Sequence, residues 1–239
     1  MRTFLFKIPN KLKTVLWGEN WLDICLYLLF ISFFLTPFID SLLVRLLTSL
    51  LYSLLMIAGV VSMSRHTAIR FAAGITAVVA ITLRWLKHIM PTPEIVKLGT
   101  LAVLVFMIML TVVILTKVYG KGRVTTHRVK GAIAVYLLFG MTWSFLYGLL
   151  DLLLHDAFNL AVALDIDDPG RLESFTYFSF ITLTTLGYGD ITPVHPVARL
   201  CVVIQALFGQ LYPATLLARL VSLEITSRQS NRSSTTDES

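Results

Sequence analysis

Long apolar runs separated by short polar segments make up most of the chain. A helix needs about 20 mostly apolar residues to cross the roughly 30 Å hydrocarbon core of a membrane. Six runs meet this requirement, so the pattern predicts six membrane-spanning helices. The expected spans are 22–39, 42–63, 68–87, 95–116, 131–154 and 197–223. Because the connections between the early spans are short, we expect consecutive helices to run antiparallel and to lie close together.

Residues 174–190, between the fifth and sixth spans, form a segment that is too short and too polar to cross. We expect it to enter the membrane and return on the same side. Ser174 is the predicted N-cap of a short aromatic-rich helix, and the glycines near the end of the segment are expected to terminate that helix. Non-helical backbone at membrane depth is tolerated only where protein buries it or where it lines a water-filled cavity. This segment therefore predicts a pore.

The composition agrees with a membrane protein, since 56% of the residues are hydrophobic and only 14% are charged. Soluble domains carry about a quarter charged residues. The fold class predicted is an all-α membrane protein. Cys25 and Cys201 lie inside apolar runs, which favours small buried side chains over a disulfide or a metal site. No catalytic triad, phosphate loop or Cys/His cluster indicates an enzyme or a cofactor.

The formal net charge of +6 would suggest a polyanionic partner in a soluble chain, but here the basic residues cluster between apolar runs. They are better explained as topology signals on the cytoplasmic side, so no nucleic-acid partner is expected. This rule predicts that both termini are cytoplasmic and that the acidic segment 151–173 lies outside. Arg45, Arg84 and Lys87 fall near the outer side, where we interpret them as residues that snorkel to the membrane surface.

These patterns divide the chain into five parts. Residues 1–21 are expected to be a basic cytoplasmic segment at the membrane surface, and 22–118 a peripheral bundle of four spanning helices. Residues 119–130 would be a basic cytoplasmic linker, 131–225 the pore domain, and 226–239 a disordered cytoplasmic tail.

The stretch TLTTLGYGD, residues 182–190, resembles the signature of potassium channels. Alternating glycines allow successive carbonyl groups to point toward one axis, and four copies of the chain would stack these groups into rings. The resemblance implies a homotetramer in which the carbonyls of Thr185, Leu186, Gly187 and Tyr188, with the Thr185 hydroxyl, coordinate K⁺. Gly189 completes the ion-binding loop. In this interpretation K⁺ is the permeant ion and not a cofactor.

The resemblance also implies residues that support the filter, namely Thr184, Asp190 and Tyr177. In the family, an aromatic residue, usually tryptophan, lies eight positions before the filter threonine and hydrogen-bonds the aspartate. Here that position is Tyr177, whose hydroxyl is expected to substitute. The next position is Phe178, which offers no hydrogen bond to the Tyr188 hydroxyl, so one usual support is missing.

Two features of the sequence concern gating. Gly209 matches the flexible glycine of the family's inner helix, and Pro213 would kink the same helix, so we expect a hinge above an inner gate at 214–221. The alternative is that Gly209 allows close helix packing. The fourth span has no arginine between Lys97 and Lys117, which argues against steep voltage gating. The basic segment 117–130 is expected either to bind anionic lipid or to act only as a topology signal.

Taken together, these observations predict a channel that conducts K⁺ passively across a plasma membrane, with a bacterial inner membrane as the expected location. Two alternatives remain open. One is a weakly selective cation channel, and the other is a non-conducting membrane scaffold or sensor that retains a pore-like segment.

Overall fold

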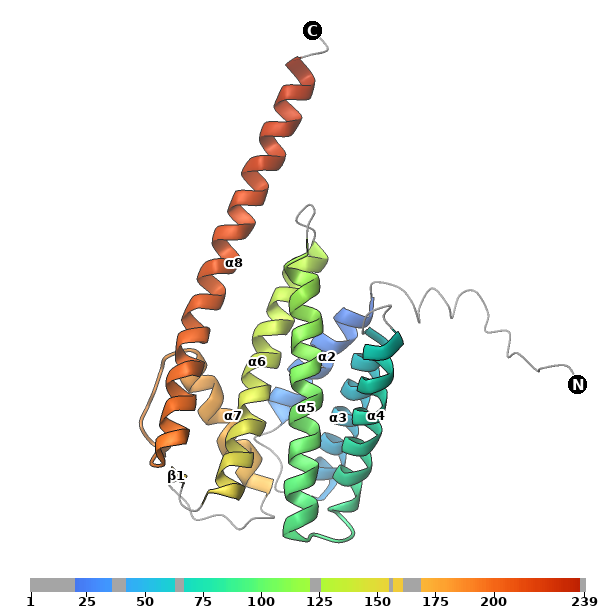
Figure 1. Cartoon of the computed structure of the whole chain (residues 1–239), viewed down its shortest axis with the longest axis vertical. Helices are drawn as coiled ribbons and strands as arrows, with labels where there is room; N and C mark the ends of the chain where they lie inside the picture. The colour runs from blue at the N-terminus through green and yellow to red at the C-terminus, as the bar shows by residue number, and fades with distance from the viewer. Residues whose placement is uncertain are drawn as a thin grey trace, which may run out of the picture.

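The computed structural model describes residues 20–35, 42–62, 67–120, 126–154, 157–160 and 169–236. The described chain is almost entirely helical, as expected, with one pair of two-residue strands (Figure 1). The helices are α2 (Asn20–Leu35), α3 (Leu42–Ser62), α4 (Thr67–Leu86), α5 (Pro93–Val118), α6 (Thr126–Leu153), α7 (Pro169–Leu183) and α8 (Pro196–Thr236). The strands are β1 (Phe158–Asn159) and β2 (Thr192–Pro193).

Five of the described helices are long and apolar enough to cross a membrane, namely α3, α4, α5, α6 and α8. The first predicted span appears as α2, whose apolar part, Asp23–Leu35, is shorter than a crossing requires. Residues 36–39 of that prediction lie outside the described residues. At 15 residues, α7 is also too short to cross, which fits the expected re-entrant helix.

The long helices pack side by side, and consecutive ones run in opposite directions (Figure 1). A buried stripe on α5, which includes Val103, Phe106, Leu110 and Ile114, recurs every three or four residues and faces the neighbouring helices. The opposite face of α5 is also apolar and exposed, as at Ile108. A helix that is apolar on all sides yet half exposed requires lipid around it.

A largely aromatic cluster, which includes Tyr147, Phe158, Phe175 and Phe178, packs α6 and α7 against β1. Phe158 of β1 lies with its ring centroid 5.2 Å from that of Phe175 and 5.6 Å from that of Phe178. The antiparallel pairing of Phe158 with Pro193 joins the segment after α6 to the segment after the filter. The loop predicted to be the filter, residues 184–190 and here called the filter loop, is thereby attached on its C-terminal side to β1.

Three predicted boundaries differ from the structure. Because α7 already begins at Pro169, Ser174 lies inside the helix and is not its N-cap; proline suits the first helical turn, where its missing N–H has no partner to lose. α6 begins at Thr126, so the last part of the predicted linker is helical. α8 continues to Thr236, well into the segment predicted to be disordered, since neither glycine nor proline follows Pro213 to stop it. The basic segment 1–19 lies outside the described residues.

Candidate ion-conduction site

The filter loop begins where α7 ends, and the helix end is closed by a Schellman motif. The amide of Leu186 donates to the carbonyl of Ile181 (2.8 Å), and the amide of Thr185 donates to the carbonyl of Thr182 (3.0 Å). Thr185 occupies the left-handed position of this motif with a φ of 60°, where glycine is usual. A β-branched residue in this region is strained. The end of the helix was predicted at the glycines, but the helix ends earlier, at Leu183, with Thr185 as its left-handed cap.

Positive φ angles recur at every second residue of the loop. Thr185 has a φ of 60°, Gly187 of 51° and Gly189 of 80°, whereas Leu186 and Tyr188 between them are not in this region. Residues other than glycine rarely adopt such angles, so Thr185 and the two glycines give this loop an unusual backbone. A Cβ atom at Gly187 or Gly189 would meet nothing within 4 Å, so a side chain would not clash there. Glycine is required at these positions because it tolerates the positive φ angle.

Hydroxyl groups link the loop to the helices around it. The Thr184 hydroxyl donates to the carbonyl of Phe180 (2.7 Å), and the Thr185 hydroxyl donates to the carbonyl of Thr184 (2.7 Å). The side-chain amide of Gln210, on α8, donates to the Thr185 hydroxyl at 3.1 Å. The sequence analysis did not single out Gln210, although an amide in an apolar helix is an unusual polar group at membrane depth.

Tyr177 lies close to Asp190, and the role of this pair in supporting the filter stays a prediction. A hydrogen bond to the Asp190 carboxylate is the largest influence that raises the pKa of the Tyr177 hydroxyl, followed by burial. Asp190 also accepts a hydrogen bond from the amide of Ile191 at 3.1 Å. The carboxylate therefore joins the end of the filter loop to the middle of α7.

Phe178 points into the aromatic cluster, with its ring centroid 5.2 Å from that of Tyr147. Behind the filter loop lies a cavity of about 310 Å³, lined by Phe178, Ile181, Gly187, Ile191 and Ala206 among others. This cavity is open at the surface of the single chain, beside Phe178.

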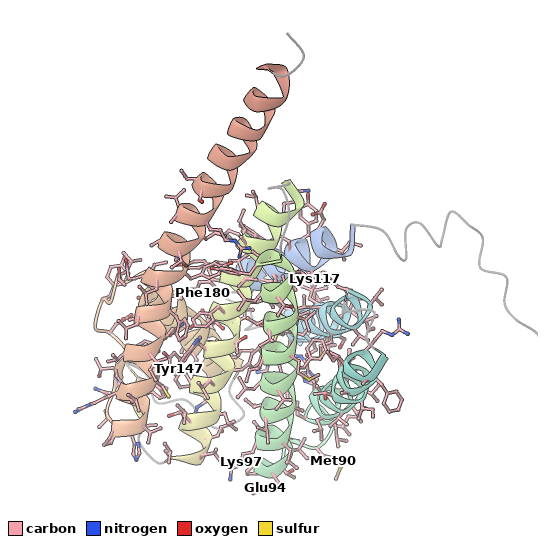
Figure 2. The ribbon with its side chains drawn as sticks, turned by 45° about the horizontal axis from the view of Figure 1, so that its top comes forward. Met90, Glu94, Lys97, Lys117, Tyr147 and Phe180 are labelled. Atoms are coloured by element: carbon pink, nitrogen blue, oxygen red, sulfur yellow. The ribbon has the colours of Figure 1, made fainter. Side chains whose placement is uncertain are left out.

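A buried hydrogen-bond network, which the sequence analysis missed, ties α7 to both of its long neighbours. Gln205 of α8 accepts a hydrogen bond from the hydroxyl of Tyr147 (2.5 Å), and its amide donates to the Ser179 hydroxyl (2.7 Å). That hydroxyl in turn donates to the carbonyl of Gly140 (2.6 Å). Tyr147, labelled in Figure 2, Ser179 and Gln205 are all fully buried. Polar side chains enclosed in an apolar bundle were the only sequence signal for this network.

Gly209 lies against the end of α7. A Cβ atom on it would come within 2.2 Å of the carbonyl oxygen of Leu183. The close-packing interpretation of Gly209 is therefore supported by a specific contact. α8 passes through Gly209 and Pro213 as one continuous helix, and the hinge stays a prediction.

The helices and loop described above lie in a part of the chain that resembles known proteins. Residues 129–225 match a family model described as an ion channel. This ion-channel region comprises most of α6, all of α7, the filter loop and most of α8, and it is less than half of the chain. Together with the five apolar helices, the match supports a multi-pass membrane protein that acts as an ion channel.

Two curated relatives match a shorter stretch. The chain is 40% identical to Protein LctB of Bacillus caldotenax over 55 residues, which are 23% of this chain and 40% of that protein. It is 42% identical to Protein LctB of Geobacillus stearothermophilus over 50 residues, or 21% of this chain and 37% of that protein. The chain thus spans well under half the length of these relatives.

The ion-channel region contacts the peripheral helices near the basic linker. The guanidinium group of Arg219, on α8, donates to the carbonyls of Tyr119 (2.6 Å) and Gly120 (3.1 Å). The same group lies 4.7 Å from the centroid of the Tyr119 ring. Of the basic linker residues, Lys117 donates to the carbonyl of Ser62, and Lys130 pairs with Asp23 at 2.8 Å. Lys121 and Arg123 lie outside the described residues.

Asp151, which belongs to the acidic stretch expected on the outer side, has a largely buried side chain that pairs with Arg171 at 2.7 Å. One prediction about a charged side chain was wrong. Arg84 was expected to snorkel to the membrane surface, but it points into the helix bundle, with 6% of the residue exposed. Glu173, the last carboxylate of that stretch, lies in α7 and is half-buried, whereas the carboxylates at 156, 165, 167 and 168 lie outside the described residues.

Proposed function

We propose that this protein is a subunit of a potassium-selective channel, in which four copies surround one pore and K⁺ passes through the loop 185–189. The observation that carries the proposal is the left-handed backbone at every second residue, Thr185, Gly187 and Gly189. This geometry suits a column of carbonyl groups that replaces the hydration shell of the ion. The ion-channel match over 129–225 supports the same function.

The position of α7 favours a cation at the inner end of this loop. The C-terminal end of a helix carries roughly half a negative charge from its aligned peptide dipoles. In α7 that end lies at Leu183, immediately before the filter residues. Four such ends around one axis would stabilise a partly dehydrated cation near the centre of the membrane.

Assembly into a tetramer is supported by the exposure of the filter loop and α8. Residues 184–190 are all exposed in the single chain, with Leu186 58% and Tyr188 69% exposed. α8 is the least buried of the five long apolar helices, and large side chains such as Leu200, Leu207 and Leu211 are exposed along it. Neighbouring copies would cover part of this surface, and lipid the rest.

We further propose the arrangement expected from the sequence: a sixth crossing that includes α2, cytoplasmic termini and a plasma-membrane location. Gating by voltage is expected to be weak. Within α5, basic side chains occur only near the two ends, at Lys97 and Lys117 (Figure 2).

The experiment that tests the function is a flux and selectivity measurement on purified protein in liposomes and planar bilayers. We expect barium-sensitive K⁺ flux, a bi-ionic reversal potential that strongly favours K⁺ over Na⁺, and a cross-linked species of four chains. Gly187→Ala should abolish the flux, because alanine at a φ of 51° costs roughly 1–2 kcal/mol per subunit. Gly74→Ala, at a helix position where a Cβ meets nothing, is the matched control and should conduct normally.

A weakly selective cation channel is the second candidate, and the cavity behind the filter beside Phe178 favours it. In that case the K⁺ against Na⁺ reversal potential would lie near zero while flux persisted. An absence of flux together with a monomeric state would instead support a membrane scaffold or sensor.

A further inference from the structure

A second cavity, of about 370 Å³, lies between the peripheral helices and the ion-channel region, away from the filter. Residues of α3, α4, α5, α6 and α7 line it, near the end of the bundle where α4 connects to α5 (Figure 1). Its basic lining residues are Arg45, Arg84, Lys87, His88 and Arg171. Within the described part of the chain, no Asp or Glu side chain lines this cavity.

Arg84 is the most enclosed of these basic groups. Only 6% of the residue is exposed, and its guanidinium carbon lies 4.3 Å from the centroid of the Tyr52 ring. The Nε atom of Arg84 is buried and has no hydrogen-bond partner among the described residues, and the same holds for Nε of Arg45. A buried cation with unsatisfied donors is costly unless an anion or another acceptor pairs with it.

Arg171, which lines the cavity, already has a carboxylate partner. Asp151 pairs with Arg171 at 2.7 Å, so these two residues together add no net charge. Partial burial, followed by the positive charges of Lys87, Arg84 and Arg45, lowers the pKa of His88. The imidazole of His88 also lies 2.9 Å from the Ser49 hydroxyl. The cavity therefore combines a positive potential with neutral hydrogen-bonding groups.

We propose that this cavity binds the phosphate group of an anionic ligand, either a phospholipid headgroup or a soluble phosphate. Guanidinium groups match phosphate oxygens with paired, charge-assisted hydrogen bonds, and two of them approach the cavity from different helices. Apolar side chains line the rest of the space, including Val96, Val103, Phe145 and Phe175. A lipid would place its acyl region against these side chains, whereas soluble phosphate would use only the basic end.

The site is independent of the filter and of the basic linker. Figure 2 shows Met90, Glu94 and Lys97 at one end of the bundle and Lys117 toward the other. The cavity includes Pro91 and Ile95, so it lies at the first of these ends. An anion bound here would join α3 and α4 to the start of α7 and thereby bridge the peripheral helices to the pore helix.

The test uses purified full-length protein, with native mass spectrometry to count bound lipid and thermal unfolding to detect soluble ligands. The probes are phosphatidylglycerol, phosphatidylcholine and inorganic phosphate. We expect phosphatidylglycerol to bind in preference to phosphatidylcholine and to raise the unfolding temperature. Arg84→Gln and, separately, Arg45→Gln should each weaken this binding about tenfold, the loss expected for one charge-assisted hydrogen bond. Arg70→Gln, an exposed position at the opposite end of α4, is the control and should leave binding unchanged.

The outcomes separate the two sources of phosphate. Stabilisation by phosphatidylglycerol that disappears in Arg45→Gln supports a lipid headgroup, and equal stabilisation by inorganic phosphate alone supports a soluble ligand. Arg45→Gln keeps the test valid if Arg84→Gln does not fold, because Arg45 is less enclosed. Binding that is the same in wild type, Arg45→Gln and Arg70→Gln, or no response to either anion, would overturn the proposal.

Discussion

The side-chain amide of Gln205 donates hydrogen bonds to both the carbonyl oxygen and the hydroxyl of Ser179, at 3.1 and 2.7 Å. Both residues are fully buried, and the carbonyl oxygen of the same amide accepts from Tyr147. One side chain thus connects all three helices of the ion-channel region. Chain segments that lie far apart in the sequence are held together by groups that cannot exchange these bonds for water.

We predict that Gln205→Leu destabilises the ion-channel region. The substitution leaves the buried Tyr147 hydroxyl without its partner, and a buried unsatisfied group costs about 1–3 kcal/mol. The Ser179 hydroxyl loses the bond from Gln205 but keeps its own bond to the carbonyl of Gly140. Thermal unfolding in detergent measures the loss. Combining Gln205→Leu with Tyr147→Phe should cost less than the sum of the two single changes, because the two side chains share one hydrogen bond. Strictly additive effects would contradict this network.

We predict that Gly209→Ala lowers both thermal stability and K⁺ flux. The new methyl group would lie 2.2 Å from the carbonyl oxygen of Leu183, so α8 or the end of α7 must move. Overpacking of this kind typically costs about 1–3 kcal/mol. Gly74→Ala is the control, since its Cβ meets nothing within 4 Å. If Gly209 acts only as a hinge, Gly209→Ala should change the open probability and leave the unfolding temperature unchanged.

We predict that Tyr177→Phe reduces the preference for K⁺ over Na⁺, because it removes the hydroxyl that donates to Asp190. The measurement is the bi-ionic reversal potential. Tyr188→Phe, which keeps the ring at an exposed filter position, is a comparison variant and should have a smaller effect. An unchanged reversal potential in Tyr177→Phe would show that Asp190 is held by other groups.

The same hydrogen bond predicts a pH dependence. Because the pKa of Tyr177 is raised in the folded protein, its neutral form is favoured there. The stabilisation should be fully present below the ordinary tyrosine pKa of about 10, and it should be lost as the pH rises through the raised value. Selectivity should therefore stay constant through neutral pH and fall only in strongly alkaline solution. Tyr177→Phe should remove that alkaline fall.

We predict that Arg219→Gln weakens the attachment of α8 to the end of α5. The change removes two charge-assisted hydrogen bonds to backbone carbonyls and the contact with the Tyr119 ring. A loss of about 1–2 kcal/mol is expected, measured by thermal unfolding. Arg199→Gln is the matched control, because Arg199 bonds only the nearby carbonyl of Pro193 and touches no residue of α5 in the described structure. Equal effects of the two substitutions would argue against a specific α5 to α8 connection.

The long helices were predicted well from the sequence because the length of an apolar run decides whether it can span. The predicted span 42–63 agrees with α3 (Leu42–Ser62), and 68–87 agrees with α4 (Thr67–Leu86), to within a residue at each end. The unusual backbone of the loop 185–189 was predicted for a similar local reason, since two glycines flank Tyr188. The K⁺-coordinating roles assigned to Thr185, Leu186, Gly187 and Tyr188 stay predictions.

The orientation of polar side chains was predicted less well. In a helix with apolar residues on all sides, periodicity does not show which side faces the bundle. The position of Arg84 over the Tyr52 ring was therefore missed. Gln205 and Gln210 were missed because their partners lie on α6, α7 and the filter loop, far away in the sequence. Such tertiary hydrogen bonds leave no local pattern.

The Schellman motif at Thr185 makes α7 and the filter loop one mechanical unit. The carbonyl of Ile181 accepts from the amides of both Leu186 and Gly187, so two filter residues are bonded to the last turn of α7. A rotation of these peptide groups must break those bonds or carry the helix end with it. Any tilt of α7, including one transmitted through Gln205 or Gly209, would therefore change the positions of the carbonyl groups in the filter loop.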